Sequence, residues 1–126
     1  MTEPPEGLVY SLYRQGQQRL EAGQPLAAAE VLELAVEHEP EQASLHETLG
    51  RAYFKSARVE RARVAFERAT ELDPTDAYAH FGLGRCYERQ GKLPAAAKHY
   101  KLACALSDRV AYRTARDRVA ARLEGG

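Results

Sequence analysis

The sequence contains no isoleucine, no asparagine and no tryptophan. Isoleucine favours β-strands and asparagine favours the tight turns of β-hairpins, so both absences argue against a sheet protein. Alanine, leucine, glutamate, arginine and glutamine are abundant instead, and all five are good helix formers. The composition therefore predicts an all-α fold. With 126 residues, of which 44% are hydrophobic, the chain can form one domain with its own core, spanning residues 1–126.

Two cysteines, Cys86 and Cys104, are too few for a disulfide framework. The first eight residues, MTEPPEGL, lack the basic stretch and the apolar run of a secretory signal. No apolar stretch approaches the roughly 20 residues that a membrane-spanning helix requires. From these absences we expect a cytoplasmic protein that does not bind a membrane.

The strongest pattern appears when the chain is compared with itself at a spacing of 34 residues. Leu49-Gly50 then aligns with Leu83-Gly84, and Pro40 aligns with Pro74. Four further columns agree in residue character, and they are Ala28/Ala62/Ala96, Leu32/Phe66/Tyr100, Ala35/Ala69/Ala103 and Gly23/Ala57/Gly91. We expect the Leu-Gly glycines to lie where two helices approach closely, and the prolines to stop the second helix of each unit.

Apolar periodicity and helix-breaking residues predict seven helices. They are placed near residues 8–22, 25–38, 42–56, 59–72, 76–90, 93–106 and 108–123. The last segment departs from the repeat and carries an apolar stripe at helical spacing, formed by Val110, Ala111, Ala115, Val119 and Leu123. We expect this stripe to cover the exposed end of the third repeat, since stacked repeats need a polar-faced cap.

The segments LGRAY…A…F…A…DP (residues 49–74) and LGRCY…A…Y…A (residues 83–103) resemble the tetratricopeptide repeat. The resemblance covers residues 9–110 and is weakest in the first copy, where Gln15-Gly16 replaces Leu-Gly. It implies an α-α superhelix, a right-handed solenoid of three helix-turn-helix units followed by the capping helix. The implied repeats cover about 9–42, 43–76 and 77–110.

In proteins of this family, the first helix of each repeat lines a concave surface on which partners usually dock. The resemblance therefore implies a partner-binding groove in this chain. Its matching positions are Tyr10, Tyr13, Gln17, Leu20 and Glu21 in the first repeat, Ser44, Glu47, Arg51, Phe54 and Lys55 in the second, and Tyr78, Phe81, Arg85, Glu88 and Arg89 in the third. From these, we select Tyr10, Tyr13, Gln17, Glu47, Arg51, Phe54, Lys55, Tyr78, Phe81, Arg85 and Arg89 as the predicted partner-binding residues.

The third-repeat positions also make sense without the family. Spacings of three and four residues place Tyr78, Phe81, Arg85 and Arg89 on one face of a helix, opposite the face expected in the core. Aromatic and arginine side chains are the residue types that anchor protein interfaces. An aromatic groove with arginines favours a partner segment with apolar anchors and some acidity. The alternative is that Tyr78 and Phe81 pack against a neighbouring helix.

One subclass of the family is not expected. Its members bind the terminal carboxylate of chaperone tails with a clamp of Lys, Asn and Arg. The corresponding residues here are Tyr13, Gln17, Thr48, Tyr78 and Gly82, and only Gln17 is a partial substitute.

No catalytic motif is present: the chain has no glycine-rich phosphate loop, no HExxH, no CxxC and no nucleophile elbow. His46 and His80 share a repeat column where the family commonly has an aromatic residue, and packing there is a more usual role than metal binding. Cys86 aligns with Ala52, which favours a buried small hydrophobe over a nucleophile. We therefore expect no enzyme, no cofactor and no metal site.

The charge distribution leaves two other functions open. Residues 1–50 carry nine acidic and two basic groups, a balance of −7, whereas residues 51–126 carry sixteen basic and nine acidic groups, a balance of +7. Such polarity can steer a charged partner or drive head-to-tail association into a homo-oligomer, so a self-assembling structural subunit is the alternative function. The five arginines of residues 109–124 suggest nucleic acid, but Asp117 and Glu124 interrupt them and we do not expect that partner.

Overall fold

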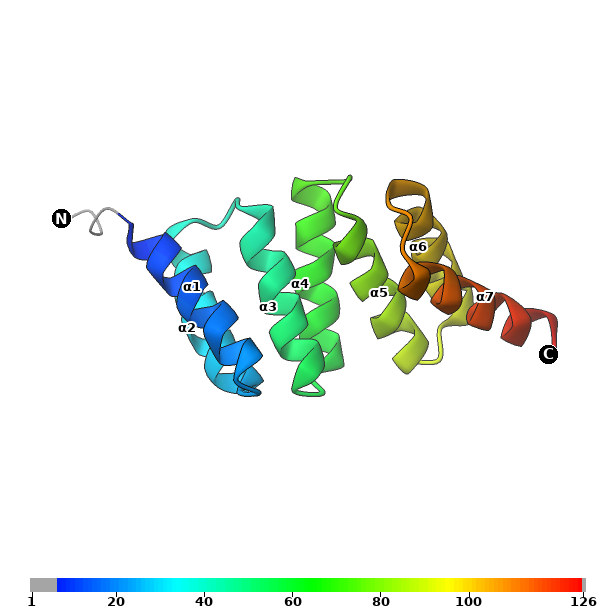
Figure 1. Cartoon of the computed structure of the whole chain (residues 1–126), viewed down its shortest axis with the longest axis horizontal. Helices are drawn as coiled ribbons and strands as arrows, with labels where there is room; N and C mark the ends of the chain where they lie inside the picture. Colours follow the sequence, from blue (N-terminus) through cyan, green and yellow to red (C-terminus); the bar gives the residue numbers. More distant parts are fainter. Residues whose placement is uncertain (1–6, 126) are drawn as a thin grey trace.

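The computed structural model describes residues 7–125 of the chain, and these form seven α-helices (Figure 1). Residues 1–6, which belong to the segment examined for a secretory signal, and Gly126 lie outside the described part. The helices are α1 (Leu8–Glu21), α2 (Pro25–His38), α3 (Ala43–Lys55), α4 (Val59–Leu72), α5 (Ala77–Arg89), α6 (Leu93–Leu106) and α7 (Val110–Glu124). All seven predicted helices are present, and no end is displaced by more than two residues. The predicted all-α superhelix is confirmed.

The helices stack as hairpins, α1 with α2, α3 with α4 and α5 with α6, and each hairpin packs on the next. Within the described residues, α1 also contacts α3, and α3 contacts α5, whereas the even-numbered helices make no comparable contacts with one another. The odd-numbered helices are therefore closer together along the stack. This spacing curves the stack and places the odd-numbered helices on its inner, concave side.

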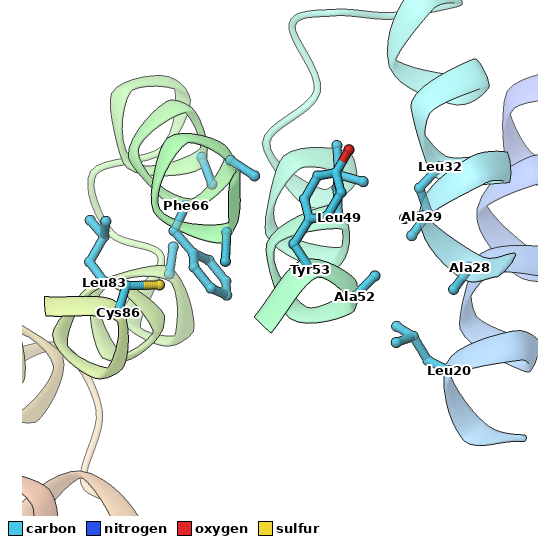
Figure 2. Close-up of a cluster of buried hydrophobic side chains, with 14 residues drawn as sticks. Leu20, Ala28, Ala29, Leu32, Leu49, Ala52, Tyr53, Phe66, Leu83 and Cys86 are labelled. Carbon is cyan, nitrogen blue, oxygen red and sulfur yellow. The ribbon is translucent and has the colours of Figure 1, made fainter. Parts of the chain in front are cut away.

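The repeated glycines make room for one large side chain in each hairpin. A Cβ atom on Gly50 would approach the Phe66 ring to 2.8 Å, and one on Gly82 of the next hairpin would approach it to 2.6 Å. Figure 2 shows Phe66 extending from α4 between α3 and α5. The sequence pattern predicts that two helices approach each other closely at these glycines. In the structure, the group that lies against them is the Phe66 side chain of α4.

The other two hairpins use the same arrangement. A Cβ on Gly16 would approach Leu32 to 2.6 Å, and one on Gly84 would approach the Tyr100 ring to 2.5 Å. Leu32 and Tyr100 have no exposed surface, so both fill their spaces completely. One hydrophobic cluster runs from Leu20 in α1 to Cys86 in α5 and joins the hairpins into a continuous core.

Helix α7 caps the stack with part of the predicted stripe: Ala115 and Val119 are buried as expected, but Ala111 is exposed and Tyr112 is buried beside it. Its buried residues are Tyr112, Ala115 and Val119, whereas Val110 and Leu123 are 68% and 44% exposed. The Tyr112 ring lies 4.8 Å from the Phe81 ring of α5, measured between centroids. Burying that large ring is worth more than burying Val110 and Leu123 at the helix ends, so the helix is rotated toward Tyr112.

His46 and His80 are both buried and do more than replace an aromatic side chain. The Nε2 atom of His46 donates to the carbonyl of Pro40 at 2.7 Å, and that of His80 donates to the carbonyl of Pro74 at 3.0 Å. These bonds satisfy a backbone oxygen in the loop that enters the repeat. Each histidine therefore fixes the loop between two hairpins.

Candidate partner-binding groove

The predicted groove residues lie on α1, α3 and α5, the helices of the concave side. Three of them, Tyr10, Lys55 and Arg89, are exposed. The other eight are partly buried, namely Tyr13, Gln17, Glu47, Arg51, Phe54, Tyr78, Phe81 and Arg85. Most of the predicted groove is therefore accessible but supported by neighbouring side chains.

Phe54 is the centre of the best-formed part of the groove. The guanidinium carbon of Arg85 lies 4.1 Å from the centre of the Phe54 ring, and that of Arg89 lies 5.3 Å from it. Both arginines belong to α5, so these cation–π contacts join two successive repeats. A guanidinium that lies over a ring still has its N–H groups directed outward around its edge, where they can bind carboxylates.

An open hollow of about 470 Å³ lies beside this cluster. It is lined by Phe54, Arg85, Glu88, Arg89, Arg118 and Arg122. Arg118 and Arg122 come from the capping helix α7 and were not among the predicted site residues. They follow Arg85 and Arg89 by 33 residues, one fewer than the repeat length. A comparison that allowed this one-residue shift would have found them.

Glu88 orients the two arginines of α7. Its carboxylate accepts from Arg118 Nε at 2.9 Å and Nη2 at 2.7 Å, and Arg122 Nη1 lies 3.5 Å away. The Tyr100 hydroxyl, buried between α5 and α7, donates to the same carboxylate at 2.8 Å. The hydrogen bonds from Arg118 lower the pKa of Glu88, with that from Tyr100 adding to the effect. Glu88 is thus a fixed anion within a hollow that carries four arginines.

A smaller hollow of about 80 Å³ lies between α1 and α3. Its lining residues are Gln17, Leu20, Glu21, Arg51 and Lys55. Gln17 donates from Nε2 to the Tyr13 hydroxyl at 3.0 Å, which holds both side chains against α1. Arg51 lies over the Tyr78 ring, 5.4 Å from its centre, and so connects this hollow to α5.

The carboxyl group of Glu47, on the concave side, has a pKa above its ordinary value. Burial raises the pKa of its carboxyl group, and the nearby carboxylate of Asp76 raises it further, against the opposing effect of Arg51. Asp76 also caps α5, where it accepts from the backbone N–H of Ala79 at 3.0 Å. Glu47 therefore contributes less negative charge to the groove than an exposed glutamate would.

Tyr78 and Phe81 form part of an aromatic row. The Tyr78 ring lies 6.3 Å from Phe66 and 6.0 Å from Phe81, and Phe81 lies 4.8 Å from Tyr112 and 5.7 Å from Tyr100. Both side chains thus pack against neighbouring helices, which was the alternative left open by the sequence. Neither ring lines the two hollows described above, and Phe81 also holds α7 in place through Tyr112.

A metal site, a nucleophilic thiol and a membrane-spanning helix find little support in the described residues. Between residues 7 and 125, no three residues of the types His, Cys, Asp and Glu are grouped closely enough to hold a metal ion. Burial raises the pKa of the Cys86 thiol to about 12, so that thiol is a poor nucleophile at neutral pH. None of the seven helices has both the length and the apolar character needed to cross a bilayer.

Several solved structures resemble this chain in fold. The first tetratricopeptide domain of Spaghetti (RPAP3), bound to the HSP90 peptide SRMEEVD, has a TM-score of 0.91 at 17% identity, covering 98% of this chain and 99% of that one. The Sgt2 domain from Aspergillus fumigatus has a TM-score of 0.87 at 20% identity, covering 98% and 83%. The type III secretion chaperone SycD of Yersinia enterocolitica, with a peptide of the translocator YopD, has 0.82 at 18% identity, covering 98% and 95%.

No curated protein matches the sequence. A family model described as "Tetratricopeptide repeat" matches residues 13–65 and, in a second overlapping match, residues 47–111. These matches span most of the chain and include the Leu-Gly, alanine and proline columns of the repeat. With the stacked hairpins and the capping helix described above, they show that the chain belongs to the tetratricopeptide repeat family.

Proposed function

We propose that this tetratricopeptide repeat protein binds a segment of another protein in its concave groove. The fold is that of a protein-interaction module, and two of the similar structures are complexes with peptides, of HSP90 in one and of YopD in the other. The observation that carries the proposal is the Phe54 cluster, in which Arg85 and Arg89 lie over one ring beside a 470 Å³ hollow.

The predicted residues have different roles in this proposal. The cations Arg51, Lys55, Arg85 and Arg89 contact the partner directly, and Phe54 offers the apolar edge that the arginines leave uncovered. Tyr10, Tyr13, Gln17 and Glu47 extend the groove over α1 and α3. Tyr78 and Phe81 support it from below. No catalytic role is included in this proposal.

The groove is tested by selecting peptides from a displayed random library on the purified protein. Selected peptides should bind the double variant Arg85→Glu/Arg89→Glu at least about tenfold more weakly, since each lost charge-assisted contact is worth about a factor of ten. Fluorescence anisotropy measures the affinity, and circular dichroism checks that the helices persist. Phe81 is left unchanged because it holds α7.

The matched control is Lys98→Glu/Lys101→Glu, which makes the same charge change on exposed residues of α6, in the even-numbered layer. The affinity of this control for the selected peptides should stay within about twofold of the wild-type value. A tenfold loss, as expected for the groove variant, corresponds to about 1.4 kcal/mol. Equal losses in the two double variants, or no loss in the groove variant, would reject the groove as the binding site.

Self-association is the second candidate function. The acidic first half and the basic second half of the chain lie toward opposite ends of the elongated stack (Figure 1), so copies have complementary ends. Light scattering at low and high salt tests this candidate, because screening shortens the range of such attraction. A particle size that falls to that of a monomer as salt rises would favour it.

A cytoplasmic location is also part of the proposal. Cys86 and Cys104 are both free thiols, which suits a reducing compartment. Cell fractionation with an antibody to the protein tests the location directly.

A further inference from the structure

Pairs of cations recur on three successive odd-numbered helices. In each helix the two members are four residues apart, which places them on the same helix face. The three pairs are Arg51/Lys55 on α3, Arg85/Arg89 on α5 and Arg118/Arg122 on α7. We call these six residues the cation ladder. The second pair follows the first by 34 residues, and the third follows the second by 33.

The ladder begins abruptly at α3. In α1 the same repeat positions hold Gln17 and Glu21, which are neutral and acidic. Arg51 and Lys55 share the smaller hollow with these two residues, and the other two pairs share the larger one. The concave side is therefore cationic along α3, α5 and α7 and turns acidic at its α1 end.

Most of the ladder is held in place before any partner arrives. Arg85 and Arg89 lie over Phe54, and Arg51 lies over Tyr78. Arg118 and Arg122 are held by Glu88, whose side chain is only 16% exposed and is fixed in turn by the Tyr100 hydroxyl. Side chains that are already ordered lose less conformational entropy on binding, so such a surface binds more tightly than one of mobile arginines.

We propose that the cation ladder binds an extended, acidic segment of the partner through side-chain carboxylates, which makes the capping helix α7 part of the binding site. This inference rests on the proposed function and specifies its ligand. Guanidinium groups bind carboxylates through paired hydrogen bonds, and four arginines surround the single Glu88 in the larger hollow. A peptide can place a neutral residue opposite Glu88 and a basic one opposite Glu21.

A nucleic acid strand fits this surface less well. Its phosphates form a continuous line of charge, which would pass both Glu88 and Glu21, and the chain as a whole has no net positive charge. An acidic peptide has no such constraint. About ten extended residues cover about 33 Å, enough to cross three stacked helices about 10 Å apart.

The test uses a fluorescein-labelled peptide of about ten residues that alternates glutamate with alanine and carries an amidated C-terminus, so that no terminal carboxylate contributes. The matched peptide has glutamine in place of glutamate. The acidic peptide should bind at least about tenfold more tightly than the glutamine peptide, and its affinity should fall as salt rises.

The role of α7 is tested with Arg118→Gln/Arg122→Gln and with the control Arg113→Gln/Arg116→Gln, which removes the same charge from the same helix. The first variant should bind the acidic peptide at least about tenfold more weakly, and the control should change less than about twofold. A triple variant that adds Glu88→Gln avoids an unpaired acid in the hollow, and it should still bind the acidic peptide more weakly than the wild type, because both arginines are gone. Thermal melting checks that all variants are folded.

Equal weakening in the control would overturn the ladder, as would tighter binding of a thymidine oligonucleotide of the same length. Particle growth in low salt without peptide that Arg118→Gln/Arg122→Gln abolishes and the control variant retains would assign the ladder to a second copy of the chain instead. If library peptides bind through Arg85 and Arg89, are not acidic and do not depend on α7, the cation-ladder proposal is rejected and the proposed function is kept. If no peptide depends on the groove, the proposed function fails as well.

Discussion

The second hairpin (α3–α4) and the third (α5–α6) fill the same structural position with different chemistry. In the second, Phe66 is enclosed by Gly50 and Gly82 and lies wholly in the core. In the third, Tyr100 is enclosed by Gly84 and helix α7, and its hydroxyl reaches Glu88 in the groove. The repeat position of Glu88 holds Phe54 in the second hairpin. The repeat position shared by Phe66 and Tyr100 therefore holds a residue that only packs in the second hairpin, and a residue that both packs and orients Glu88 in the third.

The two hairpins differ at two further positions. His80 in the third hairpin lies against His99, with ring centres 5.5 Å apart and the two Nδ1 atoms 3.2 Å apart. His46 has Ala65 at the position corresponding to His99. The turn between the helices contains Gly91 in the third hairpin and Ala57 in the second, and both have positive φ, 75° and 63°. Each difference gives a measurable contrast.

Phe66→Ala should produce the largest loss of stability. The ring is almost fully buried between two glycines, and the glycine backbone cannot move in to fill the space. We expect the free energy of unfolding to fall by about 3–5 kcal/mol, as for other buried phenylalanines. Urea unfolding followed by circular dichroism measures it. A loss below about 1 kcal/mol would mean that the hairpins close over the cavity.

Acid should destabilise the third hairpin through His99. Burial lowers the pKa of His99 to about 4, helped by the adjacent His80 and Lys98 and opposed by Glu67. The unfolded chain takes up this proton near pH 6.5, so between about pH 6.5 and 4 it binds more protons than the folded chain and stability falls as pH falls. We expect a loss of about 2 kcal/mol, allowing for partial exposure.

The variant His99→Gln isolates this effect, because it removes the titrating ring and leaves the acidic groups unchanged. Its free energy of unfolding should depend less steeply on pH than that of the wild type over the same interval. Parallel pH curves for the two proteins would assign the acid sensitivity to other groups.

Tyr100→Phe gives the third hairpin the residue type that the second hairpin has at the same repeat position, Phe66. The ring stays in place, but the bond to Glu88 is lost, at a cost of about 1.5 kcal/mol because the acceptor is charged. Glu88 should then hold Arg118 and Arg122 less firmly, and binding of the acidic peptide should weaken. Calorimetric melting and anisotropy together measure both effects. A loss of stability with unchanged affinity for the acidic peptide would show that Tyr100 does not influence the groove through Glu88.

Ala57→Gly should give the smallest effect, with the opposite sign. Ala57 has a φ of 63°, a left-handed conformation that a Cβ atom makes unfavourable and that glycine adopts readily. We expect a gain of about 0.5–1 kcal/mol. Gly91→Ala makes the reverse change at the same repeat position and should cost a similar amount. A gain in both variants would show that the turn conformation is not the cause.

The sequence predicted the helices well because their ends are set locally. Pro25 and Pro94 occupy first turns, Gly23 and Gly91 follow helix ends, and the 34-residue spacing repeats these signals. The ends of the apolar stripe on α7 were predicted wrongly for a non-local reason, although Ala115 and Val119 in its middle are buried as expected. Val110 and Leu123 have helical spacing with the buried residues, but only the position of Phe81 on another helix shows that Tyr112 is the side chain that becomes buried.

The candidate site was predicted in part. The sequence places Phe54, Arg85 and Arg89 at repeat positions on the concave side, which is where they lie. It does not show that Phe81 is committed to packing. Nor does it show that burial and Asp76 alter the charge of Glu47, because that depends on how closely α3 and the start of α5 approach.

By itself, the sequence determined the repeat, the seven helices and the columns of small and large residues that make each hairpin too apolar to stand alone. Only the tertiary structure decided that Glu88 meets Arg118, 30 residues away, and that α7 adds its arginines to the groove. The physical reason is that such contacts depend on the angle and register between stacked helices. Those quantities come from how side chains such as Tyr100 and Tyr112 pack, and no local periodicity encodes them.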